Sequence, residues 1–273
     1  MIRNLYSMKD KVVIITGASS GIGKACAEVF ARGGSKVVIA ARNAVKLAEA
    51  ERELGNDSES LGVVTDVGKE NDCKKLIDET IKRFGKVDVL INNAGISMRA
   101  LFEDTDLNVI RQVMDTNFWG TVYCTKYALP HVLKSKGSIA GISSIAGKKG
   151  LPGRTGYSAS KFAVEGFLES LRIENLKKDL HVLIACPGFT SSDIRKNALS
   201  KDGKIQHQSP REEQNMMQPE AVAQKIYHAI KNRKREIVLT RNGKLTVIMN
   251  KFFPSLMDKL VYNHFAKEKD SPF

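Results

Sequence analysis

The stretch that decides the fold runs from residue 11 to residue 33. It begins with Lys11-Val-Val-Ile-Ile15, a short run rich in β-branched residues, and continues with the glycine-rich Thr16-Gly-Ala-Ser-Ser-Gly-Ile-Gly23. The residues from Lys24 to Gly33 then carry apolar side chains at helical spacing. This order predicts a buried strand, a tight loop and a helix in direct succession.

The same alternation continues along the chain. We predict further strands at 36–40, 61–65, 87–91, 137–142 and 181–185, and helices at 42–54, 71–84, 107–133 and 157–176. Continuous apolar strands that alternate with amphipathic helices indicate a parallel sheet covered on both faces, and right-handed crossovers make such a sheet doubly wound. The prediction is therefore an α/β protein of three layers, with residues 1–273 in a single domain.

The pattern changes after Pro187. Residues 191–218 are mostly polar and weakly periodic, and they are longer than an ordinary connection, so we interpret them as a mobile substrate lid. A helix from Pro219 to about Asn232, a last strand at 236–240 and one or two amphipathic helices within 244–267, broken near Pro254, complete the prediction. The chain thus has a core of about 8–192, a lid of about 191–218 and a C-terminal helical extension of about 219–273.

Composition narrows the class of protein. The 273 residues include 42% hydrophobic and 27% charged residues, as in globular proteins. No apolar run approaches the length of a membrane-spanning helix, and the residues from Met1 to Asp10 lack the apolar core of a secretory signal, so we expect a soluble, cytoplasmic protein. The four cysteines are far apart, which favours reduced thiols over disulfides or a metal site.

The formal charge is strongly basic. Of the net +13, residues 195–273 contribute +8, with 16 Lys/Arg against 8 Asp/Glu. Such a surplus is compatible with an anionic ligand, a membrane surface or nucleic acid, and equally with an ordinary solvated surface. Lys231-x-Arg233-Lys234-Arg235 is a dense basic cluster, but no nucleic-acid recognition motif accompanies it, so we expect no nucleic-acid partner.

The glycine-rich turn is a candidate phosphate site. Gly17, Gly21 and Gly23 stand between the predicted strand and helix, where small residues let the backbone approach a pyrophosphate at the helix N-terminus. The next strand ends in Ala40-Ala41-Arg42, without the carboxylate that usually binds the ribose hydroxyls of NAD. The guanidinium of Arg42 suits a 2′-phosphate instead, which favours NADP over NAD.

A second constellation lies downstream. Tyr157 and Lys161 are four residues apart at the start of a predicted helix, so their side chains lie on one face. We expect the ammonium of Lys161 to lower the pKa of the Tyr157 phenol toward neutrality and make it a general acid or base. The hydroxyl of Ser144, beyond a strand end, is placed to hydrogen-bond a substrate carbonyl.

Taken together, these motifs resemble those of the short-chain dehydrogenase/reductase family. The matching stretches are Thr16 to Gly23, Asp66-Val67, Asn92-Asn-Ala-Gly95, Asn117, Ser144, Tyr157-x-x-x-Lys161 and Pro187-Gly188. The resemblance covers about two thirds of the chain and implies a Rossmann-type domain, a nicotinamide cofactor and hydride transfer between that cofactor and an alcohol or ketone.

The resemblance also implies a role for each matching residue. Catalytic roles fall on Asn117, Ser144, Tyr157 and Lys161, with Asn117 holding a backbone kink and a water that relays protons to Lys161. Cofactor contacts fall on Gly17, Ser19, Ser20, Gly21, Ile22, Gly23, Asp66, Val67, Asn93, Ala94, Gly95, Tyr157, Lys161, Pro187, Gly188 and Thr190, to which the strand end adds Arg42, and no metal is implied. Among these contacts, Asp66 meets the adenine, Lys161 the nicotinamide ribose and Thr190 the carboxamide. Ser192 stands where the family commonly has threonine and keeps the hydroxyl.

The substrate is the least determined feature. Apolar residues in the stretches expected to form the pocket favour a hydrophobic ketone or secondary alcohol, although each residue is equally compatible with core packing; they are Met98, Phe102, Leu151, Phe189 and Ile194. Aromatic residues interleaved with lysines in 244–267 fit core packing, a dimer contact or weak association with a membrane surface. The family resemblance implies a homo-oligomer, either a dimer or a tetramer. The alternative function is a nucleotide-binding or nucleic-acid-associated protein that keeps the fold without turnover.

Overall fold

The computed structural model describes residues 7–55, 59–210, 216–268 and 270–271. Residues 1–6 of the predicted N-terminal segment and 211–215 of the predicted lid lie outside the described residues. All four cysteines lie within the described residues, and they are buried free thiols, as the sequence indicated.

A single parallel sheet runs through this part of the chain. Its seven strands are β1 (Val12–Thr16), β2 (Lys36–Ala41), β3 (Ser60–Val64), β4 (Val89–Asn92), β5 (Ser138–Ile142), β6 (His181–Cys186) and β7 (Glu236–Val238). Their order across the sheet is β3-β2-β1-β4-β5-β6-β7. The chain therefore winds outward from β1 in one direction and from β4 in the other, and the predicted doubly wound, Rossmann-type sheet is confirmed.

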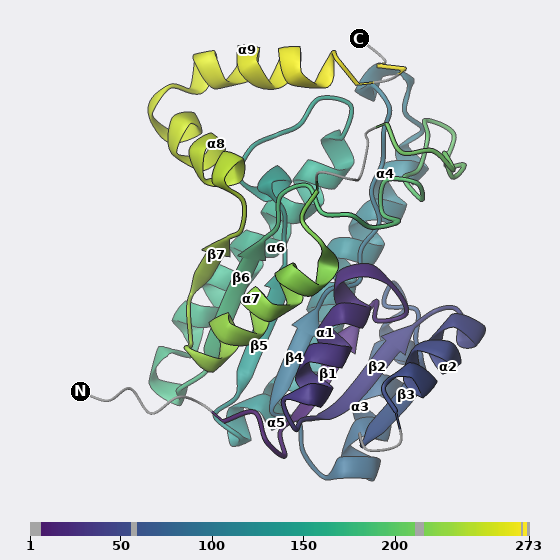
Figure 1. Ribbon diagram of the computed structural model, residues 1–273, viewed down its shortest axis with the longest axis vertical. Coiled ribbons are helices and arrows are strands. Elements are labelled where there is room, and N and C mark those ends of the chain that lie inside the picture. The colour runs from purple at the N-terminus through teal and green to yellow at the C-terminus, as the bar shows by residue number, and fades with distance from the viewer. Residues whose placement is uncertain (1–6, 56–58, 211–215, 269, 272–273) are drawn as a thin grey trace.

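Helices cover both faces of the sheet (Figure 1). One face packs against α1 (Gly21–Arg32), α2 (Ala44–Glu53) and α7 (Pro219–Lys231), and the other against α3 (Glu70–Phe84), α5 (Gly120–Lys134) and α6 (Thr155–Glu174). Alternate residues of β1 serve the two cores: Val13 and Ile15 join the first, Val12 and Ile14 the second. This period of two places an apolar layer on each side of every central strand.

The remaining elements stand at the ends of the sheet. They are α4 (Leu107–Met114), α8 (Arg241–Phe252) and α9 (Pro254–Phe265), together with the short helices η1 (Phe102–Asp104), η2 (Asp115–Trp119), η3 (Ile145–Gly147) and η4 (Leu176–Lys178). Figure 1 shows α8 and α9 across the carboxyl end of the strands. Among the described residues, none of the helices combines the length and apolar character that crossing a bilayer requires.

Several helix boundaries follow from local chemistry. Gly85 ends α3 in the left-handed conformation with φ 72°, and Pro219 and Pro254 open α7 and α9, where a missing N–H costs nothing. The break predicted near Pro254 is therefore confirmed. The last strand is shorter than predicted because Thr240 already accepts a hydrogen bond from Gly243 N as the cap of α8.

The predicted helix 107–133 is interrupted. One π-helical turn, η2, separates α4 from α5, and its central residue is Asn117. The cause is tertiary, because Asn117 bonds the backbone of the loop after β4, as described below.

The lid segment is attached to the body by backbone pairing. Thr190 pairs with Met217, and Leu199 pairs with both Met98 and Ile205. Its described residues therefore pack along the loop that follows β4. Its predicted mobility stays a prediction.

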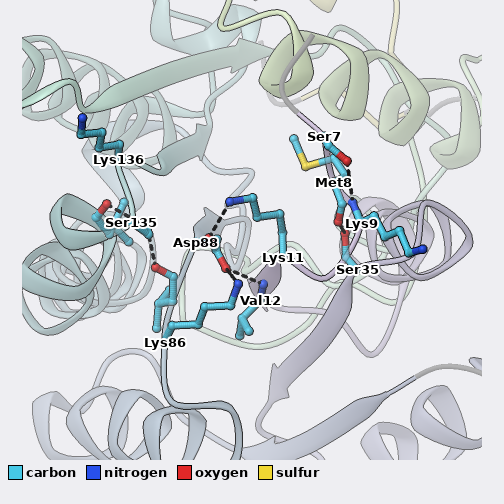
Figure 2. Close-up of polar contacts among 12 residues, drawn as sticks. Ser7, Met8, Lys9, Lys11, Val12, Ser35, Lys86, Asp88, Ser135 and Lys136 are labelled. Atoms are coloured by element: carbon cyan, nitrogen blue, oxygen red, sulfur yellow. Dashed lines mark hydrogen bonds and ion pairs between the residues drawn. The ribbon is translucent and has the colours of Figure 1, made fainter. Parts of the chain in front are cut away.

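Charged groups at the amino edge of the sheet form a compact arrangement, which Figure 2 shows in detail. The carboxylate of Asp88 is buried, and it accepts hydrogen bonds from Lys11 Nζ at 3.0 Å and from Val12 N at 2.9 Å. Lys86 Nζ lies 2.9 Å from its second oxygen. These contacts fasten the start of β1 to the start of β4.

Candidate functional site

The glycine-rich turn lies against the end of β4. A Cβ on Gly17 would lie 2.8 Å from the Cα of Ala94, and one on Gly23 would lie 2.3 Å from the carbonyl oxygen of Gly17. Gly17 and Gly21 also have φ values of +65° and +54°, a region that favours glycine. The turn therefore requires glycine at these positions for steric and conformational reasons.

Side chains from both neighbouring loops hold this turn in place. Asn93 Nδ2 donates to the carbonyls of Thr16 (2.9 Å) and Gly17 (3.2 Å), while Thr16 Oγ1 accepts from the amides of Asn93 and Ala94 at 3.0 Å each. β1 and β4 are the strands between which the sheet order reverses. Open α/β sheets bind their ligands in the crevice at such a switch point.

The N-terminus of α1 opens from the same turn. The side chain of its capping residue, Ser20, makes no capping hydrogen bond, and the first turn of the helix holds no acidic residue. Ser19 is half-buried beside it, and Ile22 lines the cavity described below. The positive end of the helix dipole is thus available to an anion.

Arg42, Asp66 and Val67 follow the carboxyl ends of the two strands beyond β1. Arg42 comes directly after β2 and is exposed, and Asp66 lies just beyond β3, where its Oδ1 accepts a hydrogen bond from Gly68 N at 3.1 Å. Val67 is buried. All three therefore stand at the carboxyl edge of the sheet, on the side of the crevice away from Tyr157.

Tyr157, Lys161 and Ser144 share one cavity of about 440 Å³. Lys161 Nζ lies 5.7 Å from the centre of the Tyr157 ring and donates a 2.8 Å hydrogen bond to the carbonyl of Ile142. Ser144 caps η3 by accepting from Ala146 N at 3.1 Å, and its side chain reaches the Tyr157 phenol. The structure thus brings together the three groups that the sequence singled out.

Burial dominates the electrostatics of this trio. It raises the pKa of Tyr157 above its ordinary value, although a hydrogen bond from Ser144 and the charges of Arg154 and Arg195 act in the opposite direction. Burial also lowers the pKa of Lys161 to about 8. The expectation that Lys161 brings the Tyr157 pKa toward neutrality is wrong for this structure, because desolvation of the phenol outweighs the nearby charges and the Lys161 amine is bonded to a carbonyl.

Asn117 stands behind Lys161, inside the π-helical turn. Its Oδ1 accepts from Ile96 N at 2.8 Å, and its Nδ2 donates to Ile96 O and Ser160 Oγ at 2.9 Å each. A Cβ on Gly95 would lie 3.1 Å from Asn117 Oδ1 and 3.4 Å from Lys161 Nζ. The kink that the resemblance implied is present, and it places the amide beside the lysine.

The segment after β6 closes the other side of the cavity. Pro187, Gly188, Thr190 and Ser192 all line it. A Cβ on Gly188 would lie only 2.5 Å from Thr240 Oγ1, so this glycine permits close packing against the start of α8. Thr190 is buried and donates a hydrogen bond to Gly188 O at 3.2 Å.

The apolar residues expected around the substrate divide into two groups. Leu151, Phe189 and Ile194 line the cavity. Met98 is instead completely buried in a separate cluster with α4, and Phe102 is an exposed residue of η1. For these two, local position alone did not indicate the direction of the side chain.

Sequence reasoning missed the wall that the C-terminal extension contributes. One face of α9 packs Met257, Val261 and Phe265 against Leu151, and the same three residues line the cavity. Other lining residues from this region are Thr240, Asn242, Gly243, Thr246, Leu260 and His264. The spacing of 257, 261 and 265 marks an apolar helix face, but it does not reveal what that face covers.

Comparison with known proteins agrees with this architecture. The family model for short chain dehydrogenases matches residues 11–203. The chain belongs to the short-chain dehydrogenase/reductase family, a family of oxidoreductases. It is 37% identical to the Dehydrogenase/reductase SDR family member 7B of Rattus norvegicus, over 98% of this chain and 86% of that protein.

The chain is also similar to a plant protein in sequence and to a solved bacterial protein in structure. The chain is 47% identical to the 11-beta-hydroxysteroid dehydrogenase-like 2 protein of Arabidopsis thaliana over 69% of this chain and 62% of that one. A short-chain dehydrogenase/reductase from Burkholderia phymatum, solved in complex with NAD, superimposes with a TM-score of 0.83 at 26% identity, covering 92% of this chain and 96% of the other. Within this family, the glycine-rich crevice and the Tyr157 cavity form one continuous candidate active site.

Proposed function

We propose that this protein is an NADP(H)-dependent oxidoreductase that transfers hydride between the nicotinamide and the carbonyl or alcohol group of a hydrophobic substrate. One observation supports this most directly: a single cavity is lined by Tyr157, Lys161 and Ser144 and also by Ile22 of the glycine-rich turn. A phenol and an ammonium beside a dinucleotide crevice are suited to proton transfer that accompanies hydride transfer.

The residues present fit a dinucleotide. The turn excludes any Cβ at Gly17 and Gly23, which leaves backbone amides and the N-terminus of α1 to face a pyrophosphate. Other residues placed to hold the cofactor are Asp66, Val67, Asn93, Ala94, Gly95, Lys161, Pro187, Gly188 and Thr190. When bound, a reduced nicotinamide supplies the hydride that reduces a carbonyl, and the oxidised form accepts it from an alcohol.

The preference for NADP rests on Arg42. It is the first residue after β2, where a carboxylate would favour NAD, and its exposed guanidinium has the fork geometry that pairs with a phosphate. Among the described residues, no carboxylate forms an ion pair with Arg42.

The chain's own side chains carry the proton. Because burial raises the pKa of Tyr157, the phenol is protonated at neutral pH and is ready to donate a proton to a carbonyl oxygen. Ser144 is placed to hold that oxygen. Lys161, with a pKa of about 8, is mostly protonated at pH 7, and its charge favours the phenolate that forms as the proton leaves.

The walls of the cavity suggest the substrate class. Its inner surface is mainly apolar, with Leu151, Phe189 and Ile194 on one side and Met257 and Val261 on the other. A hydrophobic ketone or secondary alcohol therefore fits best, with its polar group at Tyr157.

A substrate screen tests the proposal. Purified protein is offered a panel of hydrophobic and small polar ketones with NADPH or NADH, and cofactor consumption is followed by nicotinamide absorbance. We expect turnover of hydrophobic ketones and a higher kcat/KM for NADPH. Consumption of neither cofactor with any carbonyl contradicts the enzymatic assignment, while preference for NADH contradicts the role of Arg42.

The alternative of a nucleic-acid-associated protein has less support. Arg233, in the dense basic cluster, is engaged with the protein itself: its Nη2 donates to the backbone and side chain of Asp179 at 2.6 and 2.8 Å. A salt-dependent shift of labelled nucleic acid, without NADPH turnover, would favour this alternative.

Assembly and location belong to the same proposal. We expect a homo-oligomer formed through α5 and α6, since Trp119, the last residue of η2 before α5, and Phe162, on α6, present large apolar side chains to solvent. The expected location is the cytoplasm. Light scattering on the purified chain measures the mass of the assembly, and sedimentation with liposomes tests for weak membrane association through α8 and α9.

A further inference from the structure

A buried carboxylate lies behind the candidate active site and has no part in the mechanism above. Glu165 is on α6, one helical turn after Lys161 and two turns after Tyr157, so the three side chains share one face of the helix. Its side chain is only 9% exposed. A carboxylate at such depth is costly unless it is hydrogen-bonded and paired.

The carboxylate of Glu165 has three polar partners from other elements. Ser143 Oγ donates to its Oε1 at 2.5 Å, the thiol of Cys186 donates at 3.4 Å, and Lys148 Nζ lies 2.7 Å from its Oε2. The turn is also shaped around it, since a Cβ on Gly147 would lie 2.4 Å from Oε1. This set of contacts connects the ends of two strands and the turn after β5 to α6.

Two of these contacts adjoin a residue of the site. Ser143 immediately precedes Ser144, the hydroxyl that reaches Tyr157. Cys186 immediately precedes Pro187, which lines the cavity. A displacement of the Glu165 carboxylate would therefore move both flanking segments of the site.

The charge of Glu165 acts on Lys161 as well. Burial lowers the pKa of Lys161, while Cys186 and Glu165 act to raise it. Burial and Glu165 also raise the pKa of the Cys186 thiol far above neutrality, so that the thiol is uncharged at physiological pH. Of these two groups, only Glu165 supplies negative charge to the amine.

The other charges around the carboxylate come from neighbouring elements. Lys148, beyond η3, pairs with Glu165 and, at 3.2 Å, with Glu236 of β7. Two carboxylates and one ammonium leave one net negative charge in this cluster. Tyr157, which faces Lys161 from α6, is neutral because burial raises its pKa.

We propose that Glu165 is a positioning residue of this enzyme: its carboxylate, held by the hydrogen bond from Ser143, fixes the turn that carries Ser144 and places a negative charge one helical turn behind the Lys161 amine. The inference rests on the proposed function, because Lys161 is assigned there to cofactor and proton chemistry. The same arrangement accounts for a buried acid one turn beyond the lysine, where helix packing alone would favour an apolar residue.

The test compares Glu165→Gln with Glu169→Gln. Glu169 is an exposed residue one turn further along α6, so its variant removes the same charge from the same helix. For each protein, NADPH affinity is measured by fluorescence titration from pH 6 to pH 10, and kcat and KM are measured over the same range with a carbonyl substrate.

The expected results differ in pH dependence as well as in rate. In Glu165→Gln, the alkaline limit of NADPH binding moves down by about one pH unit, and kcat/KM at pH 8 falls about tenfold, with a much smaller loss at pH 6 where Lys161 is protonated in both proteins. Glu169→Gln behaves as the wild type. Lys148→Gln moves the alkaline limit upward, because Glu165 then acts on Lys161 without a competing cation.

Three outcomes overturn the inference. They are an unchanged pH dependence in Glu165→Gln with only a lower Tm, equal effects of Glu165→Gln and Glu169→Gln, and shifts of the same sign in Glu165→Gln and Lys148→Gln. If no carbonyl is reduced by the wild type, the proposed function fails, but the pH dependence of NADPH binding still decides the role of Glu165.

Discussion

The two ends of the sheet differ in how their buried charged groups are paired. At the amino edge, Asp88 is paired with Lys11 and Lys86 and also accepts from Val12 N (Figure 2). At the carboxyl edge, Lys161 is just as deeply buried, but among the described residues no carboxylate lies within ion-pair distance of it; its amine bonds a backbone carbonyl. The first arrangement stabilises the fold, and the second leaves a charge available to a ligand.

This difference shows in the direction of each pKa shift. At Asp88, burial acts to raise the pKa, but the hydrogen bonds from Val12, Lys86 and Lys11 outweigh it, so the pKa is lowered and the charged form is stabilised. At Lys161, burial prevails and the pKa falls to about 8. Changes at the amino edge should therefore affect stability, and changes at the carboxyl edge should affect activity.

The largest effect is expected for Tyr157→Phe. The variant removes the proton donor, and we expect kcat to fall by about 100-fold to 10,000-fold, the usual contribution of a positioned acid or base. The Tm should change little, because the variant keeps the buried ring and loses only the hydrogen bond with Ser144. Tyr123→Phe, on α5, is the matched control and should keep wild-type turnover; near-normal kcat in Tyr157→Phe would exclude it as the acid.

Acid should destabilise the folded protein by protonating His181, at the amino edge of the sheet. This residue opens β6, and its Nε2 donates to Lys234 O while its Nδ1 accepts from Ser138 Oγ, both at 2.9 Å. Burial lowers its pKa to about 4. Between about pH 4 and pH 6.5, this histidine is therefore mostly protonated in the unfolded chain, where its pKa is near 6.5, and mostly neutral in the folded chain.

The free energy of unfolding should therefore fall as the pH is lowered. The contribution of neutral His181 is complete above about pH 6.5 and is lost as the pH falls toward 4, at a cost of about 3 kcal/mol. Urea unfolding of the wild type and of His181→Asn between pH 7 and pH 4 measures this contribution. The stability advantage of the wild type should shrink over that range, and a constant difference would show that the histidine does not titrate as proposed.

Removing the acidic centre of the amino edge should also destabilise the protein. Asp88→Asn loses charge-assisted hydrogen bonds with two lysines that keep partial access to water, so we expect a loss of about 2 kcal/mol at neutral pH. Because the folded pKa of Asp88 is lowered, this difference should vanish as the pH falls below about 4. Asp78→Asn, which breaks an exposed pair with Lys74, should cost less than about 0.5 kcal/mol.

The kinetics of Asp88→Asn make the comparison sharper. The kcat of the folded variant should match the wild type, because its contacts lie at the amino ends of β1 and β4, whereas Tyr157 lines the cavity at the carboxyl ends of the strands. A large loss of kcat with an unchanged Tm would mean that the two ends of the sheet are coupled and that the division drawn here is wrong.

The parts of the molecule that the sequence predicts well are those governed by neighbours in the chain. The apolar run at 11–15, the glycines at 17, 21 and 23 and the proline at 254 act through period, backbone conformation and close approach within one turn, and the structure agrees with each. The pairing of Tyr157 with Lys161 on one helix face belongs to the same class, because it needs only a spacing of four.

The parts that it predicts poorly depend on contacts between distant segments. The π-helical turn arises because Asn117 bonds the backbone of Ile96. The wall formed by α9 depends on where Met257 and its apolar neighbours dock, and the pKa of Tyr157 depends on how completely other elements cover the phenol. None of these three features has a local pattern that fixes it.

The smallest effect is expected for Arg42, at the far side of the carboxyl edge. Because its guanidinium is exposed, a phosphate contact there is partly screened by water, and Arg42→Ala should lower kcat/KM for NADPH by about tenfold while leaving kcat/KM for NADH nearly unchanged. Lys46→Ala, an exposed cation on α2, controls for a general loss of positive charge and should lower the NADPH value less than twofold. An equal loss for both cofactors in Arg42→Ala would mean that the residue supports the crevice rather than the 2′-phosphate. The Tm of both variants should equal that of the wild type, because both side chains are exposed and the packing of β2 is unaffected.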